Sequence, residues 1–382
     1  MKKVLVPRVR FKGFSDNWEQ GNIGEVFELT RGEVLSQRKI KNKKMGEYIY
    51  PVFSSQTLNN GLLGFYNNFL FKNSITWTTD GANAGTVLYR DGLFYATNVC
   101  GVMLQKTSIK PSSYFAHEIN VKVKKHVIKA GNPKLMINVL HEVLINFSKN
   151  KLEQEKISIL IENIDNLITL EEIKHNKLKQ LKETLLQKMF PEGNSKIPRI
   201  RFKGFEGEWK EEKLDDIFKV ITGGEPPKNY KNSKHPVGKY KYPIYSNGQE
   251  ANAIWGFSDN YSINTEAITI SSIGTIGFPV VRKMFFTPII RLKTLLPYNK
   301  NMNINFLNLS VSQINFSFNQ AGIPSMNSNQ LKDNIILISR NFSEQQKIGD
   351  FFSKIDSLLS LYQSKLNKLK QIKESLLQKM FL

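Results

Sequence analysis

Two corresponding stretches of this chain are rich in side chains that can hydrogen-bond to bases and phosphates. Serine, threonine, asparagine, glutamine and aspartate on loops are suited to reading base edges or contacting a nucleic-acid backbone. The candidates are Ser54, Ser55, Gln56, Thr79, Asp80 and Asn83, and then Ser246, Asn247, Gln249, Ser271, Ser272 and Thr275. Because the same residue types fill ordinary turns, the alternative for each one taken singly is a structural role.

Basic residues lie close to these stretches and could contact phosphate groups. They occur in and near "SQRKIKNKK" (36–44) and "KNYKNSKHPVGKYK" (228–241), and the candidates are Arg31, Arg38, Lys39, Lys41, Lys228 and Lys231. The chain has 54 Lys and Arg against 33 Asp and Glu, so its formal net charge of +21 favours polyanionic partners. The alternative is a solvated loop. Neighbouring aromatic residues are predicted to be core rather than stacking platforms, namely Phe53, Trp77, Tyr245 and Trp255.

Catalytic and metal-binding patterns are missing from the sequence. It contains no P-loop motif, its five histidines are scattered without ligand spacing, and its single cysteine, Cys100, offers no zinc site. Glu172 and Lys174 form a nuclease-like Glu-x-Lys with no carboxylate partner, which we interpret as chance. We therefore predict no catalytic and no metal site. No apolar run reaches the roughly 20 residues of a membrane span, and one cysteine fits a reducing compartment, so we expect a cytoplasmic protein.

The sequence repeats itself at a fixed offset. "PRVRFKGF" (7–14) recurs as "PRIRFKGF" (198–205), and 198 − 7 = 191. "KLKQLKETLLQKMF" (177–190) recurs as "KLKQIKESLLQKMF" (368–381), again 191 residues later. The middles agree far less. The chain therefore consists of two tandem units with similar ends and dissimilar centres.

Near the end of each unit, an apolar residue recurs at intervals of seven residues with few interruptions. This spacing is typical of a coiled coil. The first row is Ile157, Ile164, Leu178 and Leu185 in one unit and Ile348, Ile355, Tyr362, Leu369 and Leu376 in the other. A second row is predicted at Leu160, Leu167, Leu181, Phe351, Leu358 and Ile372. We expect helix starts capped by Asn150 and Ser343. The alternative is a helical hairpin packed on a globular core.

The order of elements predicts an α+β protein. Short β-branched runs interrupted by glycine, in 73–92 and 267–286, predict strands joined by tight turns in both centres. We expect globular domains at 1–150 and 191–341, and long helices at 151–190 and 342–382. Because the chain alternates globular unit and helix, the helices can pair antiparallel and hold the two domains apart about an internal pseudo-twofold axis.

This arrangement resembles the DNA-specificity (S) subunit of a type I restriction-modification enzyme. The resemblance rests on the order of the twin "FKGF…W" openings (Phe11 to Trp18, Phe202 to Trp209), the twin glycine turns, the helix starts at Glu153 and Glu344, and the twin "LLQKMF" ends. "TTDGANAG" departs from the Ser-x-Gly-Thr-x-Gly turn of the second unit, so the resemblance gives that turn no common DNA-contact role.

The resemblance implies that each centre is a target recognition domain reading one half of a split double-stranded DNA sequence. The coiled coil would set the gap between the halves. Two methyltransferase (M) subunits would dock on the chain, and endonuclease/translocase (R) subunits would join them. It also implies a non-catalytic chain that binds no cofactor itself and has no membrane partner, with S-adenosylmethionine, ATP and magnesium held by the partner subunits.

Two other classes of protein remain open on the sequence. A structural coiled-coil scaffold would explain the heptad pattern but neither the charge nor the paired, differing centres. An independent DNA-modifying enzyme would explain the charge but lacks a catalytic constellation.

Overall fold

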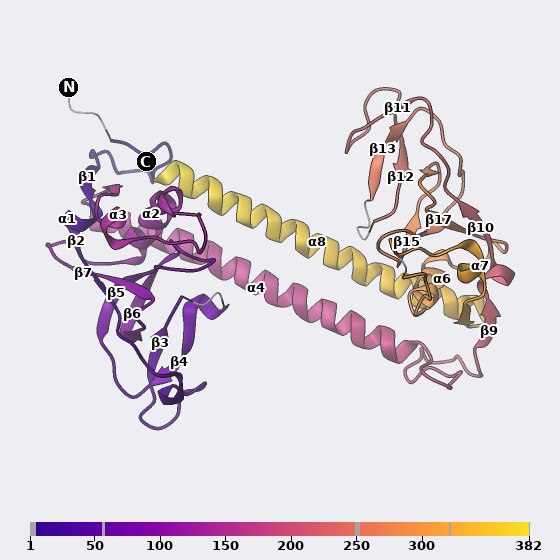
Figure 1. The fold of residues 1–382 in the computed structure, drawn as a ribbon, viewed down its shortest axis with the longest axis horizontal. Helices are drawn as coiled ribbons and strands as arrows, with labels where there is room; N and C mark the ends of the chain where they lie inside the picture. The colour runs from indigo at the N-terminus through magenta and orange to yellow at the C-terminus, as the bar shows by residue number, and fades with distance from the viewer. Residues whose placement is uncertain (1–4, 56–57, 249–252, 321, 382) are drawn as a thin grey trace. The chain divides into compact units, whose positions relative to one another are not determined.

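The computed structural model describes residues 5–55, 58–248, 253–320 and 322–381. It divides into two compact units (Figure 1). Unit 1 comprises Met1–Glu172 with Lys365–Leu382, and unit 2 comprises Ile173–Ser364. The two long helices, α4 (Lys151–Met189) and α8 (Phe342–Met380), each contribute one part to unit 1 and the other part to unit 2.

Unit 1 is built on a six-stranded sheet in the order β2-β7-β5-β6-β3-β4, in which only β3 and β6 pair in parallel. A separate antiparallel pair joins β1 and β8. The elements are β1 (Glu19–Asn22), α1 (Ile23–Val26), β2 (Phe27–Arg31), η1 (Gln37–Lys39), β3 (Tyr50–Phe53), η2 (Leu58–Gly61), β4 (Leu62–Tyr66), β5 (Phe71–Thr78), β6 (Val87–Ala96), β7 (Cys100–Gln105), α2 (Ser113–Val123), η3 (Lys124–His126), α3 (Ile137–His141) and β8 (Leu144–Phe147).

Unit 2 repeats this plan with two smaller sheets. The order β10-β17-β14-β15 corresponds to β2-β7-β5-β6, and the pair β9–β18 corresponds to β1–β8. The remaining sheet has the order β11-β13-β12-β16. The elements are β9 (Lys210–Lys213), α5 (Leu214–Ile217), β10 (Phe218–Thr222), β11 (Tyr230–Lys231), β12 (Tyr242–Tyr245), β13 (Ile254–Ser258), β14 (Ala267–Ser271), β15 (Gly277–Arg282), β16 (Thr287–Pro288), β17 (Lys293–Pro297), α6 (Ile304–Val311), α7 (Ser328–Lys332) and β18 (Ile335–Ile338).

The long helices pair antiparallel within each unit. In unit 1, Lys373 Nζ lies 2.5 Å from Asp165 and Lys365 Nζ lies 2.8 Å from Glu171, so later positions on α4 meet earlier positions on α8. In unit 2, Lys182 Nζ lies 2.5 Å from Asp356. The predicted α+β class with an antiparallel two-helix coiled coil and an internal repeat is confirmed.

The buried seam of the coil differs from the predicted one in its second row. Residues of the first row are buried or half-buried, including Ile157, Ile164, Ile348 and Ile355. Four members of the predicted second row are 41% to 51% exposed, namely Leu167, Leu181, Leu358 and Ile372, so that prediction is wrong for them. The buried second row lies one residue further on, at Ile161, Ile168, Phe352 and Leu366. A seven-residue repeat fixes one row, but the second can follow after three or after four residues.

Asparagines cap both long helices. Asn150 Oδ1 accepts hydrogen bonds from the backbone N–H of Leu152 (3.0 Å) and Glu153 (3.3 Å), so this predicted cap is confirmed. Asn341 Oδ1 accepts from Ser343 (2.9 Å) and Glu344 (3.3 Å) in the same way. The predicted Ser343 cap is wrong, because α8 begins at Phe342 and Asn341, two residues before Ser343, takes the cap position.

Each globular core is closed by the end of a long helix. In unit 1, the Phe381 ring lies 6.2 Å from that of Trp18 and 5.4 Å from that of Tyr114. In unit 2, the Phe190 ring lies 5.3 Å from that of Trp209. The repeated "LLQKMF" ends are therefore core segments, with Met189 and Met380 buried beside them. Among the described residues, no helix has the length and apolar character needed to cross a membrane.

Candidate nucleic-acid interface

The repeated phrase at 7–14 and 198–205 joins the segment before each globular sheet to a long helix. Arg10 Nε and Nη2 donate to the two carboxylate oxygens of Glu153 at 2.5 and 2.9 Å, and Arg201 makes the same pair with Glu344 at 2.5 and 2.8 Å. Trp18 Nε1 adds a longer contact to Glu153 at 3.3 Å. Both glutamate side chains are fully buried. Such bidentate pairs fix geometry as well as charge, so both units are held to the coil in the same way.

The ion pair sets the charge state of the buried glutamate. Burial alone would raise the pKa of Glu153, but hydrogen bonds from Arg10, Ser148 and Trp18 outweigh it, and the net effect is a lowered pKa. The carboxylate is therefore ionised at neutral pH, and its charge depends on Arg10.

In unit 1, three of the predicted contact residues, Thr79, Asp80 and Asn83, form hydrogen bonds within the fold. Thr79 is buried, and its hydroxyl lies 2.9 Å from the Val99 carbonyl and 2.6 Å from the Asp80 carboxylate. Asn83 is half-buried, and its backbone carbonyl accepts from the Thr86 N–H at 3.0 Å. These contacts hold the turn after β5, so Thr79 stabilises the conformation of that turn.

In unit 2, the structure brings three predicted residues together. Asn247 Oδ1 accepts from the Ser272 N–H at 2.8 Å and lies 3.4 Å from the hydroxyl of buried Ser271. Asn247 Nδ2 donates to the Ile290 carbonyl at 2.5 Å, and Ser272 Oγ donates to the Arg291 carbonyl at 2.6 Å. This polar cluster holds the backbone of the 290–291 turn.

Other polar candidates lie on half-exposed loops. Ser54 and Ser55 follow β3, Ser246 follows β12, and Thr275 lies in the turn between β14 and β15. The backbone N–H groups of Ser54 and Ser246 bond across their loops, to the carbonyls of residues 61 and 253. Within the described residues the side chains of these four form no hydrogen bond, so they are available to a ligand. Gln56 and Gln249 lie outside the described residues.

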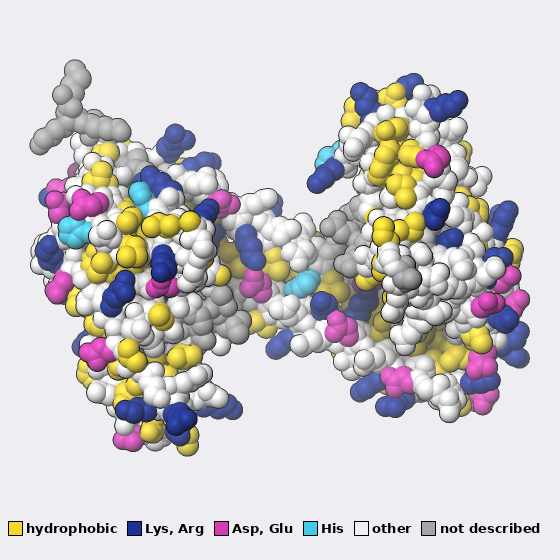
Figure 2. Space-filling view, in the orientation of Figure 1, with side chains coloured by type: hydrophobic (Ala, Val, Ile, Leu, Met, Phe, Trp, Pro, Cys, Tyr) yellow, Lys and Arg dark blue, Asp and Glu magenta, His cyan; other side chains and the backbone are white. Residues whose placement is uncertain are grey.

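The basic candidates are exposed and form no ion pair within the described parts of the chain. Arg38 and Lys39 lie in η1, Arg31 ends β2, and Lys231 lies in β11. Lys41 Nζ and Lys231 Nζ lie 5.6 and 6.0 Å from the ring centroids of Tyr48 and Tyr240, and Lys228 is exposed on the loop before β11. On the face drawn in Figure 2, Lys and Arg lie at the end of unit 1 beyond β3 and β4, and at the end of unit 2 around β11. Both units therefore present cations without counter-charges.

The sequence analysis missed two arginines, the half-buried Arg90 and the buried Arg282. The Arg90 guanidinium lies 3.7 Å from the Phe53 ring centroid, and it donates to Thr76 Oγ1 (3.0 Å) and to the Asn60 carbonyl (2.7 Å). Burial lowers the pKa of Arg90 to about 10. In unit 2, Arg282 lies 3.9 Å from the Tyr245 ring centroid, and burial lowers its pKa also. The signal in the sequence was an arginine repeated at an offset of 282 − 90 = 192.

These arginines support the loops that carry predicted residues. Phe53 directly precedes Ser54 and Ser55, and Tyr245 directly precedes Ser246. Arg90 also holds the far end of its loop through the Asn60 carbonyl. The half-buried Arg90, stacked on the Phe53 ring, thus positions the loop that follows β3, and the matching stack of Arg282 on Tyr245 directly precedes the loop that follows β12.

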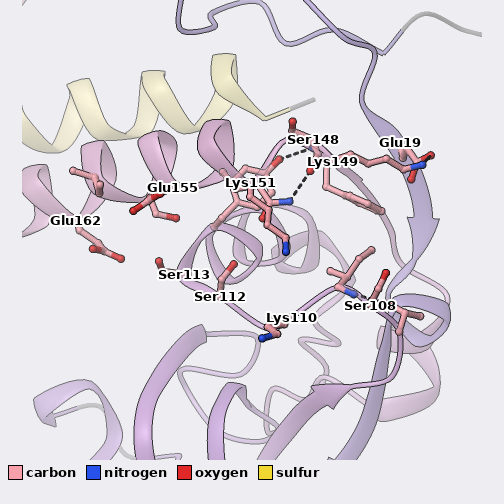
Figure 3. Close-up of a pocket in the computed structure, with 17 residues that line it drawn as sticks. Glu19, Ser108, Lys110, Ser112, Ser113, Ser148, Lys149, Lys151, Glu155 and Glu162 are labelled. Carbon is pink, nitrogen blue, oxygen red and sulfur yellow. Dashed lines mark hydrogen bonds and ion pairs between the residues drawn. The ribbon is translucent and has the colours of Figure 1, made fainter. Parts of the chain in front are cut away.

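A cavity of about 800 Å³ lies in unit 1 between α2, α4 and β8 (Figure 3). Its lining includes Lys110, Lys151, Glu155 and Glu162, so its charges are mixed, and none of the predicted contact residues faces it. The matching place in unit 2 is occupied, since a Cβ on Gly349 would lie 2.1 Å from Asn303 Oδ1. In unit 1 these two positions are Ser158 and Ser112, which line the open cavity. The cavity therefore does not belong to the predicted interface.

No cluster of three or more potential metal ligands occurs among the residues that the structure describes. The arrangement in each unit is a set of loops and strand ends carrying hydroxyl, amide and cationic groups. Such groups can bind a polyanion and read base edges.

Comparison with known proteins identifies relatives over the whole chain. The model of the type I restriction modification DNA specificity domain matches twice, at residues 15–180 and 206–371. A protein of Mycoplasma pneumoniae described as a type I specificity subunit is 32% identical over 331 residues, 86% of each chain. One of Mycoplasma genitalium is 24% identical over 99% of this chain and 97% of its own.

Solved structures match the fold. The crystal structure of a type I restriction-modification S subunit from M. genitalium has a TM-score of 0.71 at 19% identity, covering 99% of both chains. A chain from a study of complex assembly in a type I system has a TM-score of 0.53 at 14% identity, covering 95% of this chain and 97% of that one.

Proposed function

The chain belongs to the family of type I restriction-modification DNA specificity subunits, which recognise DNA and are not themselves catalytic, and we propose that each of its units reads one half of a split double-stranded DNA target. Unit 1 and unit 2 would contact different base sequences. The two long helices would set the distance between the half-sites.

One observation carries this proposal: the anchors of the two units are alike, whereas their candidate interfaces differ. The Arg10–Glu153 and Arg201–Glu344 pairs have the same geometry and the same sequence separation of 143 residues. Among the described residues of unit 1, the polar cluster around Asn247 has no counterpart of the same composition, and Thr79 and Asp80 hold the corresponding turn. Two readers of different sequences on one repeated scaffold require this combination.

We assign the target recognition domains to residues 1–150 and 191–341, and the spacer helices to 151–190 and 342–382. The DNA-contact candidates whose side chains form no hydrogen bond or ion pair within the described residues are Ser54, Ser55, Ser246, Thr275, Arg31, Arg38, Lys39, Lys41, Lys228 and Lys231. Thr79, Ser271, Ser272 and Asn247 are assigned to positioning of the turns, because their polar atoms are engaged within the fold.

Two methyltransferase subunits are the proposed partners of the helices. Large apolar side chains remain exposed on the long helices, including Leu167 and Leu170 in unit 1 and Leu181, Leu358 and Leu361 in unit 2. Exposed apolar rows on a helix pair favour further helices packing against them. Endonuclease/translocase subunits would join this complex in the cytoplasm, and the partner subunits would hold S-adenosylmethionine, ATP and magnesium.

The test is to co-express the chain with the methyltransferase subunit of its host and to map methylated adenines by single-molecule sequencing. The expected result is a motif of two short defined parts around an unspecified spacer. Replacing residues 210–320 by those of another specificity subunit should change one part only, and a change in both parts would refute the two-reader proposal. A complex without any methylation would favour a scaffold, and methylation by the purified chain alone would make it an enzyme.

A further inference from the structure

The last residue pair, or rung, of the β2–β7 ladder in unit 1 and of the equivalent β10–β17 ladder in unit 2 includes one cationic residue. The cation lies on the first strand of the pair in unit 1 and on the second strand in unit 2. In unit 1, Arg31 at the end of β2 pairs with Gly101 of β7. In unit 2, the same rung pairs Thr222 of β10 with Lys293 of β17. The offsets, 222 − 31 = 191 and 293 − 101 = 192, match those of the sequence repeat. Cross-strand neighbours share one face of a sheet, so both cations occupy corresponding places.

The strand on the other side of β7 or β17 explains why the cation lies on different strands in the two units. Trp77 of β5 lies beside Gly101, and a Cβ on Gly101 would lie 2.2 Å from the indole. The tryptophan thus leaves room only for glycine on β7, and the cation of unit 1 stands on β2. In unit 2 the third residue is the smaller Ile270, opposite Lys293. The rung keeps its positive charge although the packing beneath it differs.

In unit 2, no carboxylate among the residues that the structure describes neutralises the charge on this rung. Lys293 is only 5% exposed, and its ammonium donates to Thr222 Oγ1 (3.0 Å) and Ser328 Oγ (2.9 Å). Neither partner carries a charge. Burial lowers the pKa of Lys293, and the neighbouring Arg291 lowers it further. A buried ammonium without a carboxylate is unfavourable by itself, so the site is suited to an anionic ligand.

The 290–291 turn presents Arg291 at the same place. Ile290 and Arg291 have φ values of 52° and 60°, a left-handed conformation that is rare for a β-branched residue. Their N–H groups donate to the carbonyls of Gly224 (2.8 Å) and Gly223 (2.9 Å), while Asn247 and Ser272 hold their own carbonyls. Strain fixed by so many contacts is typical of functional sites. The Arg291 side chain is exposed and forms no ion pair within the described residues.

We propose that Arg291 and Lys293 bind a backbone phosphate of DNA in the half-site read by unit 2, and that Arg31 binds the equivalent phosphate in unit 1. This inference rests on the proposed function and adds to it a phosphate-contact position common to both units. A phosphate supplies the negative charge that the rung lacks, and it contains no sequence information. Two units that read different bases can therefore share it.

Salt dependence of DNA binding tests the inference. The complex with the methyltransferase subunit is titrated into a fluorescent duplex carrying the mapped target, and binding is followed by anisotropy. Each lost phosphate contact lowers the slope of log K against log[salt] by about 0.9. When salt is raised from about 50 to about 200 mM, the affinity of the parent protein should therefore fall by a factor about 3.5 times larger than the affinity of Arg291→Gln. Arg31→Gln should behave alike, and neither should alter the methylation motif.

Lys332→Gln is the matched control. Lys332 is a lysine of unit 2 that is already paired with Asp215 at 2.9 Å, so its slope should equal that of the parent. Lys293→Met removes the buried charge, and Lys293→Arg retains it. The slope should fall for the first and stay for the second, provided that thermal unfolding shows both variants folded. Because Arg291 is exposed, Arg291→Gln decides the inference even if both Lys293 variants unfold.

An unchanged slope for Arg291→Gln would overturn the inference, and so would a relaxed motif with the parental slope, which would make Arg291 a base reader. Measuring the salt slopes also on a duplex that lacks the target separates this inference from the proposed function. If the parent shows no bipartite motif but Arg291→Gln still lowers the slope, the phosphate contact stands and the two-reader proposal fails. If a bipartite motif is found but the slopes are unchanged, the two-reader proposal stands and the phosphate contact fails.

Discussion

Replacing Arg10 by alanine isolates the contribution of the repeated anchor. The Arg10 side chain is 9% exposed and that of Glu153 is fully buried, and the guanidinium also donates through Nη1 to the Asp16 carbonyl at 2.7 Å. In Arg10→Ala the Glu153 carboxylate would stay in the interior with only Trp18 and Ser148 as partners. The variant therefore creates a buried charge without a counter-charge.

The magnitude follows from this geometry. Removing one partner of a buried ion pair costs about 3 to 5 kcal/mol, and since Glu153 keeps the indole N–H, we expect about 3 kcal/mol. Arg10→Ala/Glu153→Gln should be more stable than Arg10→Ala, because the second change removes the unpaired charge. The lowered pKa of Glu153 gives a stabilisation present above its ordinary pKa and lost as pH falls through the lowered value. Arg10→Ala should abolish this dependence.

Hydrogen exchange resolved by peptide is the assay, because it reports each unit separately. Arg10→Ala should speed exchange in residues 5–30 and leave residues 200–220 unchanged, and Arg201→Ala should do the reverse. Urea unfolding gives the free energy. A loss below about 0.5 kcal/mol, the range of ordinary surface substitutions, or a double variant less stable than Arg10→Ala, would refute the anchoring argument.

Three further predictions concern packing and charge. Burial raises the pKa of Glu118 to about 7, so the fold loses stability as pH rises from its ordinary 4.5 through 7. Glu118→Gln should be more stable above pH 7 by up to about 3 kcal/mol and equal at low pH, measured by unfolding at several pH values. Gly349→Ala would place a Cβ 2.1 Å from Asn303, the cap of α6, and calorimetry should show a loss of about 1 kcal/mol or more. Gly101→Ala would press on the Trp77 indole and should cost about 1 to 3 kcal/mol in urea unfolding.

The ends of the repeat could be predicted from sequence because local patterns determine them. The heptad row, the Asn150 cap and the glycine and proline residues that follow position 189 all act over a few neighbouring residues. The second row could not be chosen in the same way. Leu167 and Ile168 are adjacent and both apolar, and only the crossing of α4 with α8 decides which one is buried.

The candidate interface was predictable in residue type but not in role. Thr79 and Ser272 are polar residues in glycine-rich turns, as a base reader would be, yet both are buried with their hydroxyls bonded to backbone carbonyls. The cation on the last rung of unit 2, Lys293, was not predictable either, although Arg31 of unit 1 was a candidate. Its position depends on Thr222 pairing with Lys293, which are far apart in the sequence and carry no local signal of their contact.

The boundaries of the sequence repeat are not the boundaries of the folded units. The repeat invites a cut after residue 190, but Phe381, at the other end of the chain, packs against Trp18 and Tyr114 in the core of unit 1. A fragment ending at 190 would lack that ring, and its own Phe190 belongs against Trp209 and Phe306 in unit 2. Because each "LLQKMF" end completes the core of a unit other than the one in which its helix begins, the two helices must both be present for either core to close. The near-identity of the two ends then has a structural cause, because both pack against the same kind of aromatic cluster. Each cluster contains a tryptophan after the "FKGF" phrase and an aromatic residue of the helix that follows the sheet.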